Sequence, residues 1–128
     1  MKNLLFVAAL MLFVFYASSC KKESTTALSQ YTDAVTCNEA DDNLNTYSQK
    51  ISTILNNSCA TAGCHDAVTR ESGKDYSSYS TAKSGMDATG YCSINHGSGC
   101  KTMPRSLPKL TDAEIHDLTC WAKNNYPN

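Results

Sequence analysis

Two cysteines and a histidine lie close together in the stretch from Cys59 to His65, which has the sequence CATAGCH. Covalent haem attachment requires two thiols followed directly by an imidazole. The sulfurs add to the haem vinyl groups, and the histidine binds the iron as proximal ligand. The usual motif has two residues between the cysteines, whereas this chain has four. The pattern therefore indicates a longer variant of the haem motif, with Cys59 and Cys64 as anchors and His65 as proximal ligand.

A six-coordinate haem needs a second axial ligand, which a methionine or histidine on a distant loop can supply. Met103 is the leading candidate, because Pro104 follows it and restricts the backbone of this segment. His96 lies in the same Gly-, Ser- and Pro-rich segment and is the alternative iron ligand. The competing interpretations are that Met103 is an apolar packing residue and that His96 is an ordinary polar loop residue.

The first twenty residues have the features of an export signal. Lys2 precedes an apolar run from Leu4 to Tyr16, which is too short to span a bilayer as a permanent helix. Small residues at 17–19 come directly before Cys20, as in the lipobox of bacterial lipoproteins. We therefore expect residues 1–19 to be a signal peptide and Cys20 to carry lipid; ordinary signal cleavage at the same bond is the alternative.

Four cysteines remain once the lipid and haem positions are assigned, and an exported protein is expected to pair them as disulfides. Four cysteines allow three connectivities, and sequence alone does not choose among them. We favour one bond that closes a short turn-rich loop and one that ties the start of the domain to its last helix: Cys92–Cys100 and Cys37–Cys120.

The chain beyond the signal is poor in large apolar residues. Only twelve of the 109 residues from Cys20 onward are Leu, Ile, Val or Phe, about 11%, and a self-sufficient core usually needs about 20% or more. We therefore expect a small domain that depends on crosslinks or on a large apolar cofactor. Ten basic and twelve acidic residues remain after the signal, and this balance argues against nucleic acid as a partner.

Amphipathic patterns on both sides of the CATAGCH stretch predict the elements that position it. A first helix is expected over 46–57, where Thr46 and Gln49 have capping-box spacing, and it ends just before the first thiol. The last helix is the clearest, because Thr111 and Glu114 form a second capping box before an apolar face.

The segments between these helices have less regular patterns. A short middle helix is expected over 78–84, with Gly85 placed to terminate it, and the composition of 90–108 predicts a loop. Residues 20–36 are rich in Ser, Thr and charge and are expected to form a flexible tether. The remaining residues, 37–128, have the length of one domain.

These segments together resemble a class I monohaem c-type cytochrome. The resemblance covers about Thr46 to Pro127. It depends on the helix before the thiols, the Met103-Pro104 pair and the terminal segment with Trp121. More closely, the chain is similar to exported bacterial cytochrome-c-like domains that have a long-spaced haem motif and a Ser-Ile-Asn-His stretch, here residues 93–96.

The resemblance implies an all-α fold of about three helices around one covalent haem c, with long loops. Carried over residue by residue, it implies that Cys59 and Cys64 hold the haem, that His65 is the proximal ligand and that Met103 is the distal ligand. It also implies that the first and last helices pack against each other, with Trp121 near that contact or near a propionate. The four cysteines assigned to disulfides are not part of the general family pattern.

The expected function is that of a membrane-anchored electron carrier in which iron cycles between Fe(III) and Fe(II). Its partners would be redox proteins, and lipid on Cys20 would hold it at the outer membrane, facing the periplasm or the cell surface. No catalytic triad, phosphate-binding glycine loop or paired carboxylates indicate an enzyme. The alternatives are a haem-based ligand sensor or weak peroxidase with an open distal site, and a haem-free binding module. In that module Cys59 and Cys64 would form a disulfide or, with His65 and another cysteine, a structural zinc site.

Overall fold

The structure is a computed structural model, which describes residues 24–38 and 44–128. No strand occurs in these ranges, which confirms the all-α class for the described part of the chain. The expected signal peptide and Cys20 lie outside it. The helices in chain order are α2 (Ser24–Thr32), η2 (Tyr47–Ile51), α4 (Ser52–Ser58), η3 (Glu71–Gly73), α5 (Tyr79–Gly85), α6 (Ala88–Ile94) and α7 (Asp112–Lys123).

The predicted first helix forms as η2 followed directly by α4. Thr46 is its N-cap, and its Oγ1 accepts a hydrogen bond from the Gln49 N–H at 3.3 Å. The first turn is π-helical, because the Ile51 N–H bonds the Thr46 carbonyl five residues earlier. The predicted apolar face is buried, and its members are Tyr47, Ile51, Ile54 and Leu55.

The last helix, α7, begins with the predicted capping box. Thr111 Oγ1 accepts from the Glu114 N–H at 3.2 Å, and Glu114 Oε2 accepts from the Thr111 N–H at 2.8 Å. Each bond satisfies a backbone donor that the first turn leaves without a helical partner. The apolar face predicted for this helix, at Ile115, Leu118 and Ala122, is buried.

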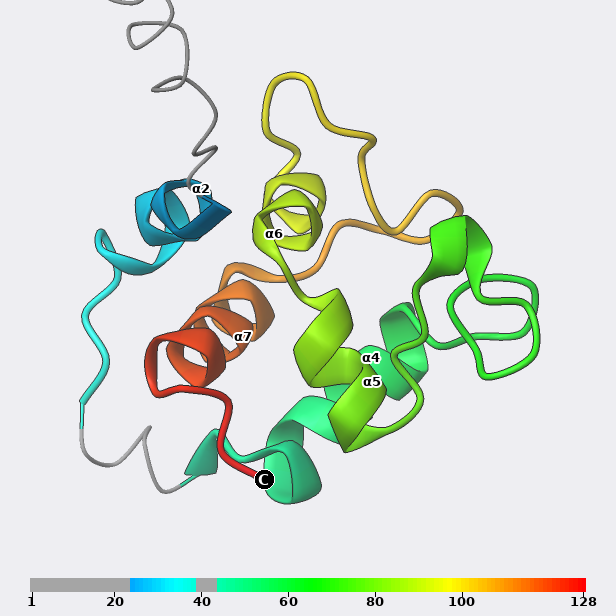
Figure 1. Cartoon of the computed structure of the whole chain (residues 1–128), viewed down its shortest axis with the longest axis horizontal. Helices are drawn as coiled ribbons and strands as arrows, with labels where there is room; N and C mark the ends of the chain where they lie inside the picture. The colour runs from blue at the N-terminus through cyan, green and yellow to red at the C-terminus, as the bar shows by residue number, and fades with distance from the viewer. Residues whose placement is uncertain (1–23, 39–43) are drawn as a thin grey trace, which may run out of the picture.

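The first and last helices pack against each other, as expected. Trp121 of α7 has no exposed surface, and its ring centroid lies 6.0 Å from that of Tyr47 in η2. Lys50 Nζ of η2 lies 2.7 Å from Asp117 Oδ2 of α7. The chain end closes this contact, since the Tyr47 N–H and the Trp121 Nε1–H both bond the Pro127 carbonyl, and Figure 1 shows the C-terminus beside η2.

The expectation of a flexible tether over residues 20–36 is wrong for the part that the structure describes. Residues 24–32 form α2, which lies beside α6 and α7 (Figure 1). Leu28 and Tyr31 pack against the core, and the Tyr31 ring stacks on Tyr91 with centroids 6.4 Å apart. Two apolar residues three positions apart lie on the same face of a helix. A single pair of this kind is too weak a pattern to predict the helix from sequence.

The middle helix forms as predicted. The prediction of a loop over 90–108 is wrong for its first residues, which are helical. Ser78 caps α5, and its Oγ accepts from the Thr81 N–H at 3.4 Å. A further helix, α6, follows, and Asp87 Oδ1 caps it by accepting from the Gly90 N–H at 2.9 Å. A Cβ at Gly90 would lie 3.4 Å from Met86 Sδ, so this glycine permits close packing inside a helix and does not mark a loop.

Aromatic and sulfur-containing side chains supplement the aliphatic residues of the core. Its largest fully buried members include Trp121, Tyr91 and Met86. The two favoured disulfides are confirmed: Cys37–Cys120 joins the segment after α2 to α7, and Cys92–Cys100 closes a loop after α6. Covalent crosslinks therefore supplement a core with few aliphatic side chains.

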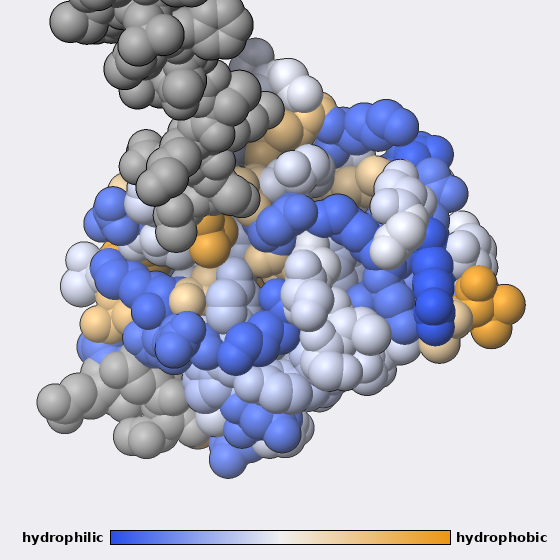
Figure 2. Space-filling model, in the orientation of Figure 1, coloured by the Kyte–Doolittle hydropathy of each residue, from blue (hydrophilic) through white to orange (hydrophobic). Residues whose placement is uncertain are grey.

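The surface is largely hydrophilic on the face shown in Figure 2, with hydrophobic residues in separate patches. The exposed large apolar residues of the described part are Leu44, Val68 and Leu107, which lie far apart in the chain. Within residues 24–38 and 44–128, no helix is long and apolar enough to cross a bilayer.

Candidate functional site

The two thiols and the histidine lie on a loop that begins where α4 ends. The Cys59 N–H completes the helix by bonding the Leu55 carbonyl at 2.8 Å. The chain then turns, with the Cys64 N–H bonded to the Thr61 carbonyl at 3.0 Å. The His65 N–H bonds the Cys59 carbonyl at 3.1 Å and so closes the loop. The four residues between the cysteines are thus held in one closed turn, which brings Cys59 and His65 together.

Cys59 and Cys64 are both free thiols, and they face different surroundings. Cys59 is 8% exposed and belongs to the core cluster, whereas Cys64 is exposed. Burial, with smaller contributions from Cys64 and Glu114, raises the pKa of Cys59 to about 12. The other described cysteines are paired in disulfides. In this structure the two thiols are therefore not bonded to each other. The haem-free alternative with a Cys59–Cys64 disulfide would require that bond.

Asp66 organises the part of the loop next to the histidine. Its Oδ2 accepts from the Gly63 N–H at 3.0 Å, and its Oδ1 accepts from the Val68 N–H at 2.8 Å and the Thr69 N–H at 2.9 Å. These hydrogen bonds, those from Thr69 first, lower the pKa of Asp66 to about 2. One carboxylate therefore connects the backbone on both sides of Cys64 and His65.

His65 is buried, and the orientation of its ring is fixed. Its Nδ1 lies 3.3 Å from the Lys74 carbonyl oxygen. A carbonyl can only accept, so Nδ1 carries the proton in this bond, and in that tautomer the lone pair lies on Nε2. The ring packs on Tyr76 with centroids 4.9 Å apart, and the Tyr76 N–H bonds the His65 carbonyl at 2.9 Å. A metal-binding histidine commonly has this arrangement, with one nitrogen bonded to a carbonyl and the other available to a metal.

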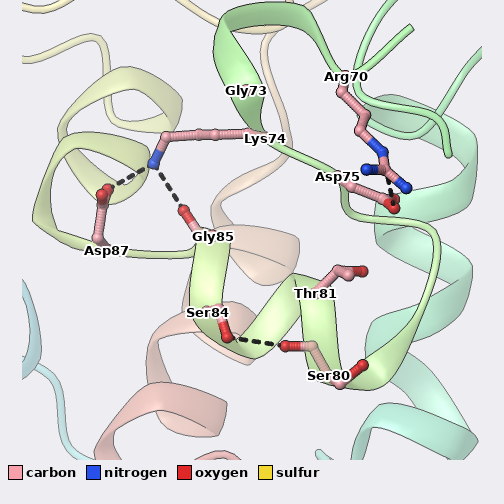
Figure 3. A pocket seen from close by; sticks show the side chains of 9 residues that line it. All are labelled: Arg70, Gly73, Lys74, Asp75, Ser80, Thr81, Ser84, Gly85 and Asp87. Atoms are coloured by element: carbon pink, nitrogen blue, oxygen red, sulfur yellow. Dashed lines mark hydrogen bonds and ion pairs between the residues drawn. The ribbon is translucent and has the colours of Figure 1, made fainter. Parts of the chain in front are cut away.

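Lys74 is itself anchored at both ends. Its backbone carbonyl faces His65, and its Nζ donates to the Gly85 carbonyl at 2.7 Å and lies 2.8 Å from Asp87 Oδ1. Figure 3 shows the side chain extending from the segment before Asp75 to the turn between α5 and α6. The acceptor that orients His65 is therefore tied to the rest of the fold.

Met103 lies on a different loop, which contacts the thiol loop through neighbouring residues. Its side chain is half-buried. Two residues further on, Arg105 Nη2 lies 3.8 Å from Glu71 Oε1, and the Glu71 N–H bonds the Cys64 carbonyl at 2.9 Å. The structure thus brings the Met103 segment beside the segment that follows His65. The link runs through Arg105 and Glu71.

His96, the alternative iron ligand, lies on the Met103 loop. Its Nε2 lies 3.2 Å from the Met103 carbonyl oxygen. Because the carbonyl accepts, this nitrogen carries a proton and is not available to a metal in this arrangement. The ring therefore contacts the backbone of the leading candidate ligand.

Asp66 and Lys74 are site residues that the motifs in the sequence do not predict. An aspartate that caps a tight turn has a recognisable local signal, since its carboxylate bonds N–H groups two and three residues further along the chain. Lys74 acts through its backbone carbonyl, which any residue would provide. No side-chain pattern could have found it.

Two surface hollows lie outside the thiol loop. One, of about 570 Å³, is bounded by Arg70, Lys74 and the hydroxyl groups on α5 (Figure 3). The other, of about 380 Å³, lies between α2 and α7. Neither is lined by Cys59, Cys64, His65 or Met103. Within the described residues, no group of three or more His, Cys, Asp or Glu side chains is arranged to hold a metal ion.

The residues of the loop fit a covalent haem in their chemistry. Two free thiols can form thioethers, one imidazole nitrogen is available for iron, and Cys59 adjoins an apolar cluster that could contact a porphyrin. Comparisons of the chain with protein-family models, with curated proteins and with solved structures find no match.

Proposed function

We propose that this protein is a monohaem c-type cytochrome that carries single electrons. The observation that supports this most strongly is the state of His65: its Nδ1 is bonded to the Lys74 carbonyl, and its Nε2 lone pair is left for a metal. The same loop carries two free thiols in a chain whose other described cysteines are paired. A histidine oriented in this way beside two unpaired thiols suits haem attachment better than it suits a structural disulfide.

Attachment of a haem would be an addition reaction at each thiol. The sulfur would bond one carbon of a vinyl group and the thiol proton would move to the other carbon, so no atom would be lost and no oxidant would be needed. Cys64 is exposed, but Cys59 is buried and its pKa is about 12, so its thiolate is scarce at neutral pH. Haem addition at Cys59 therefore belongs to a stage before the chain has closed around this residue.

A bound haem supplies one-electron chemistry at iron. The residues around it hold the ligands and make or break no substrate bond. His65 is held by Lys74 and by the Tyr76 ring, and Met103 is the proposed sixth ligand. A methionine–histidine ligand pair gives the iron a higher reduction potential than a pair of histidines does. The proposed partners are redox proteins, and the proposed membrane attachment is lipid on Cys20.

The test is a denaturing gel stained for haem, run on protein produced with its leader and a cytochrome c maturation system. The wild-type chain should retain haem after denaturation, and Cys59→Ala/Cys64→Ala should not. The matched control is Cys37→Ala/Cys120→Ala, which also removes two cysteines but leaves the thiol loop intact, so it should retain haem. A wild-type chain without haem on this gel, or haem equally retained by Cys59→Ala/Cys64→Ala, would refute the proposal.

A further inference from the structure

The loop that follows α6 is closed covalently just before Met103. The Cys92–Cys100 disulfide joins the helix to a point three residues upstream of Met103. Within the closed loop, the Gly97 N–H bonds the Cys92 carbonyl at 2.8 Å. A Cβ at Gly97 would lie 2.9 Å from Cys92 Sγ, so the backbone passes directly over the disulfide. This loop is therefore compact and leaves no room for a side chain at that point.

Both backbone polar groups of Met103 are bonded to residues inside the closed loop. The Met103 N–H donates to the Ser93 carbonyl at 3.1 Å, and the Met103 carbonyl accepts from His96 Nε2 at 3.2 Å. Ser93 is 8% exposed and adjoins Cys92, so its position is set by the buried helix. The disulfide thus ties the segment before Met103 to the end of α6, where both backbone partners of Met103 lie.

His96 adopts a backbone conformation that favours its bond to Met103. Its φ is +58°, in the left-handed region that a residue with a side chain seldom adopts. It follows the C-cap of α6, Asn95, where a helix often ends in this conformation, usually with glycine. Here a histidine occupies the position, and its ring contacts the Met103 carbonyl.

We propose that His96 and the Cys92–Cys100 disulfide position Met103 for the iron, and that reduction of this disulfide by an exported dithiol protein releases Met103. The inference rests on the proposed function. It makes His96 a positioning residue and not an iron ligand.

Cys100 offers the accessible sulfur for the proposed step. Each disulfide joins a half-buried cysteine to a buried one, Cys100 to Cys92 and Cys37 to Cys120, and Cys100 lies beside exposed Ser98 and Gly99. A thiolate of the dithiol attacks Cys100 Sγ, the sulfur–sulfur bond breaks, and Cys92 leaves as a thiolate that takes up a proton. The second thiol of the reductant then closes its own disulfide and frees Cys100. In sum, the protein disulfide gains two electrons and two protons, and the dithiol is oxidised.

The test compares haem-loaded wild-type protein with Cys92→Ala/Cys100→Ala and with the control Cys37→Ala/Cys120→Ala. Three quantities are measured: the far-red absorption of thioether-bound ferric iron, the midpoint potential, and hydrogen exchange of the Met103 amide. The variant without Cys92–Cys100 should keep its haem, lose most of the far-red band, show a lower potential and exchange the Met103 amide faster. The control should match wild type in the far-red band and the midpoint potential, which do not depend on the overall stability of the fold.

A second variant keeps the inference testable if the first does not fold. His96 is exposed, so His96→Ala removes a surface side chain together with its bond to Met103. Added imidazole competes with Met103 for the iron. Since one hydrogen bond is lost, imidazole should bind about fivefold more tightly to this variant than to wild type. His96→Gln retains an N–H donor and should restore part of the wild-type affinity.

The outcomes separate the inference from the proposed function. A wild-type protein without haem overturns both. A wild-type protein with haem and the far-red band overturns the inference alone if the spectrum and potential are unchanged in Cys92→Ala/Cys100→Ala and the imidazole affinity is unchanged in His96→Ala. Loss of the band in Cys92→Ala/Cys100→Ala and tighter imidazole binding by His96→Ala, with haem still attached in both variants, support it.

Discussion

The two disulfides close loops of very different length, so their removal should destabilise the protein to different extents. In the chain-entropy model, a crosslink stabilises the folded state mainly by restricting the unfolded chain, and the effect grows with the logarithm of loop length. The bonded cysteines are 83 residues apart in Cys37–Cys120 and 8 apart in Cys92–Cys100. With those separations the relation gives about 4.5 kcal/mol for the long loop and about 2.5 kcal/mol for the short one at 25 °C.

The packing around the Cys37–Cys120 bond also favours a larger loss of stability when that bond is removed. Cys120 has no exposed surface, so Cys120→Ala also leaves a small space in α7, and the segment after α2 loses its covalent tie to that helix. Lys123 Nζ still donates to the Val35 carbonyl at 2.6 Å, but this bond is on the surface and holds the segment only weakly. The long-loop variant is therefore expected to be the less stable by about 2 kcal/mol or more.

The assay is urea unfolding of Cys37→Ala/Cys120→Ala and Cys92→Ala/Cys100→Ala beside wild type, all in the same haem state. The free energy of unfolding in water should fall in both variants, and further in the long-loop variant. An equal or larger loss in the short-loop variant would refute the reasoning from loop length. It would show that local packing, and not restriction of the unfolded chain, determines what each bond contributes.

Three further predictions concern the thiol loop, the contact between the first and last helices, and the membrane anchor. The pKa of Asp66 is lowered to about 2, so its carboxylate stabilises the loop above about pH 4, and this contribution is lost as the pH falls toward 2. The protection factors of the amides at 68–69 should fall over that range in wild type, whereas Asp66→Asn should show low protection at every pH. Lys50→Ala leaves the nearly buried Asp117 carboxylate without its partner and should lower the free energy of unfolding by ~1–2 kcal/mol, measured by urea unfolding. Cys20→Ala should move the protein from the membrane to the soluble fraction, and continued membrane fractionation would contradict lipid attachment there.

Sequence reasoning succeeded where a local signal and the tertiary contact agreed. The Thr111–Glu114 capping box and the Thr46 cap both form, and the apolar faces they precede are buried. The disulfide pairs were also favoured correctly, because a short turn-rich loop and a terminal helix each offered one suitable partner.

It failed where packing overrides local preference. α6 contains Gly90, which by itself favours a loop, but Tyr91 and Ile94 are buried and the glycine permits contact with Met86. Only a few apolar side chains of α2 contact the core, and they do so only when α6 and α7 are folded beside this helix. At the site, the backbone carbonyl of Lys74 orients His65, and a backbone group has no signature in the sequence.

The central claim is that Cys59, Cys64 and His65 hold a haem that carries one electron. The most direct measurement is a redox titration of the purified protein followed by visible absorption. The account predicts sharp absorption bands in the reduced state and a single transition that fits one electron. A folded but colourless protein would contradict it, as would a coloured protein whose haem shows no reversible one-electron step.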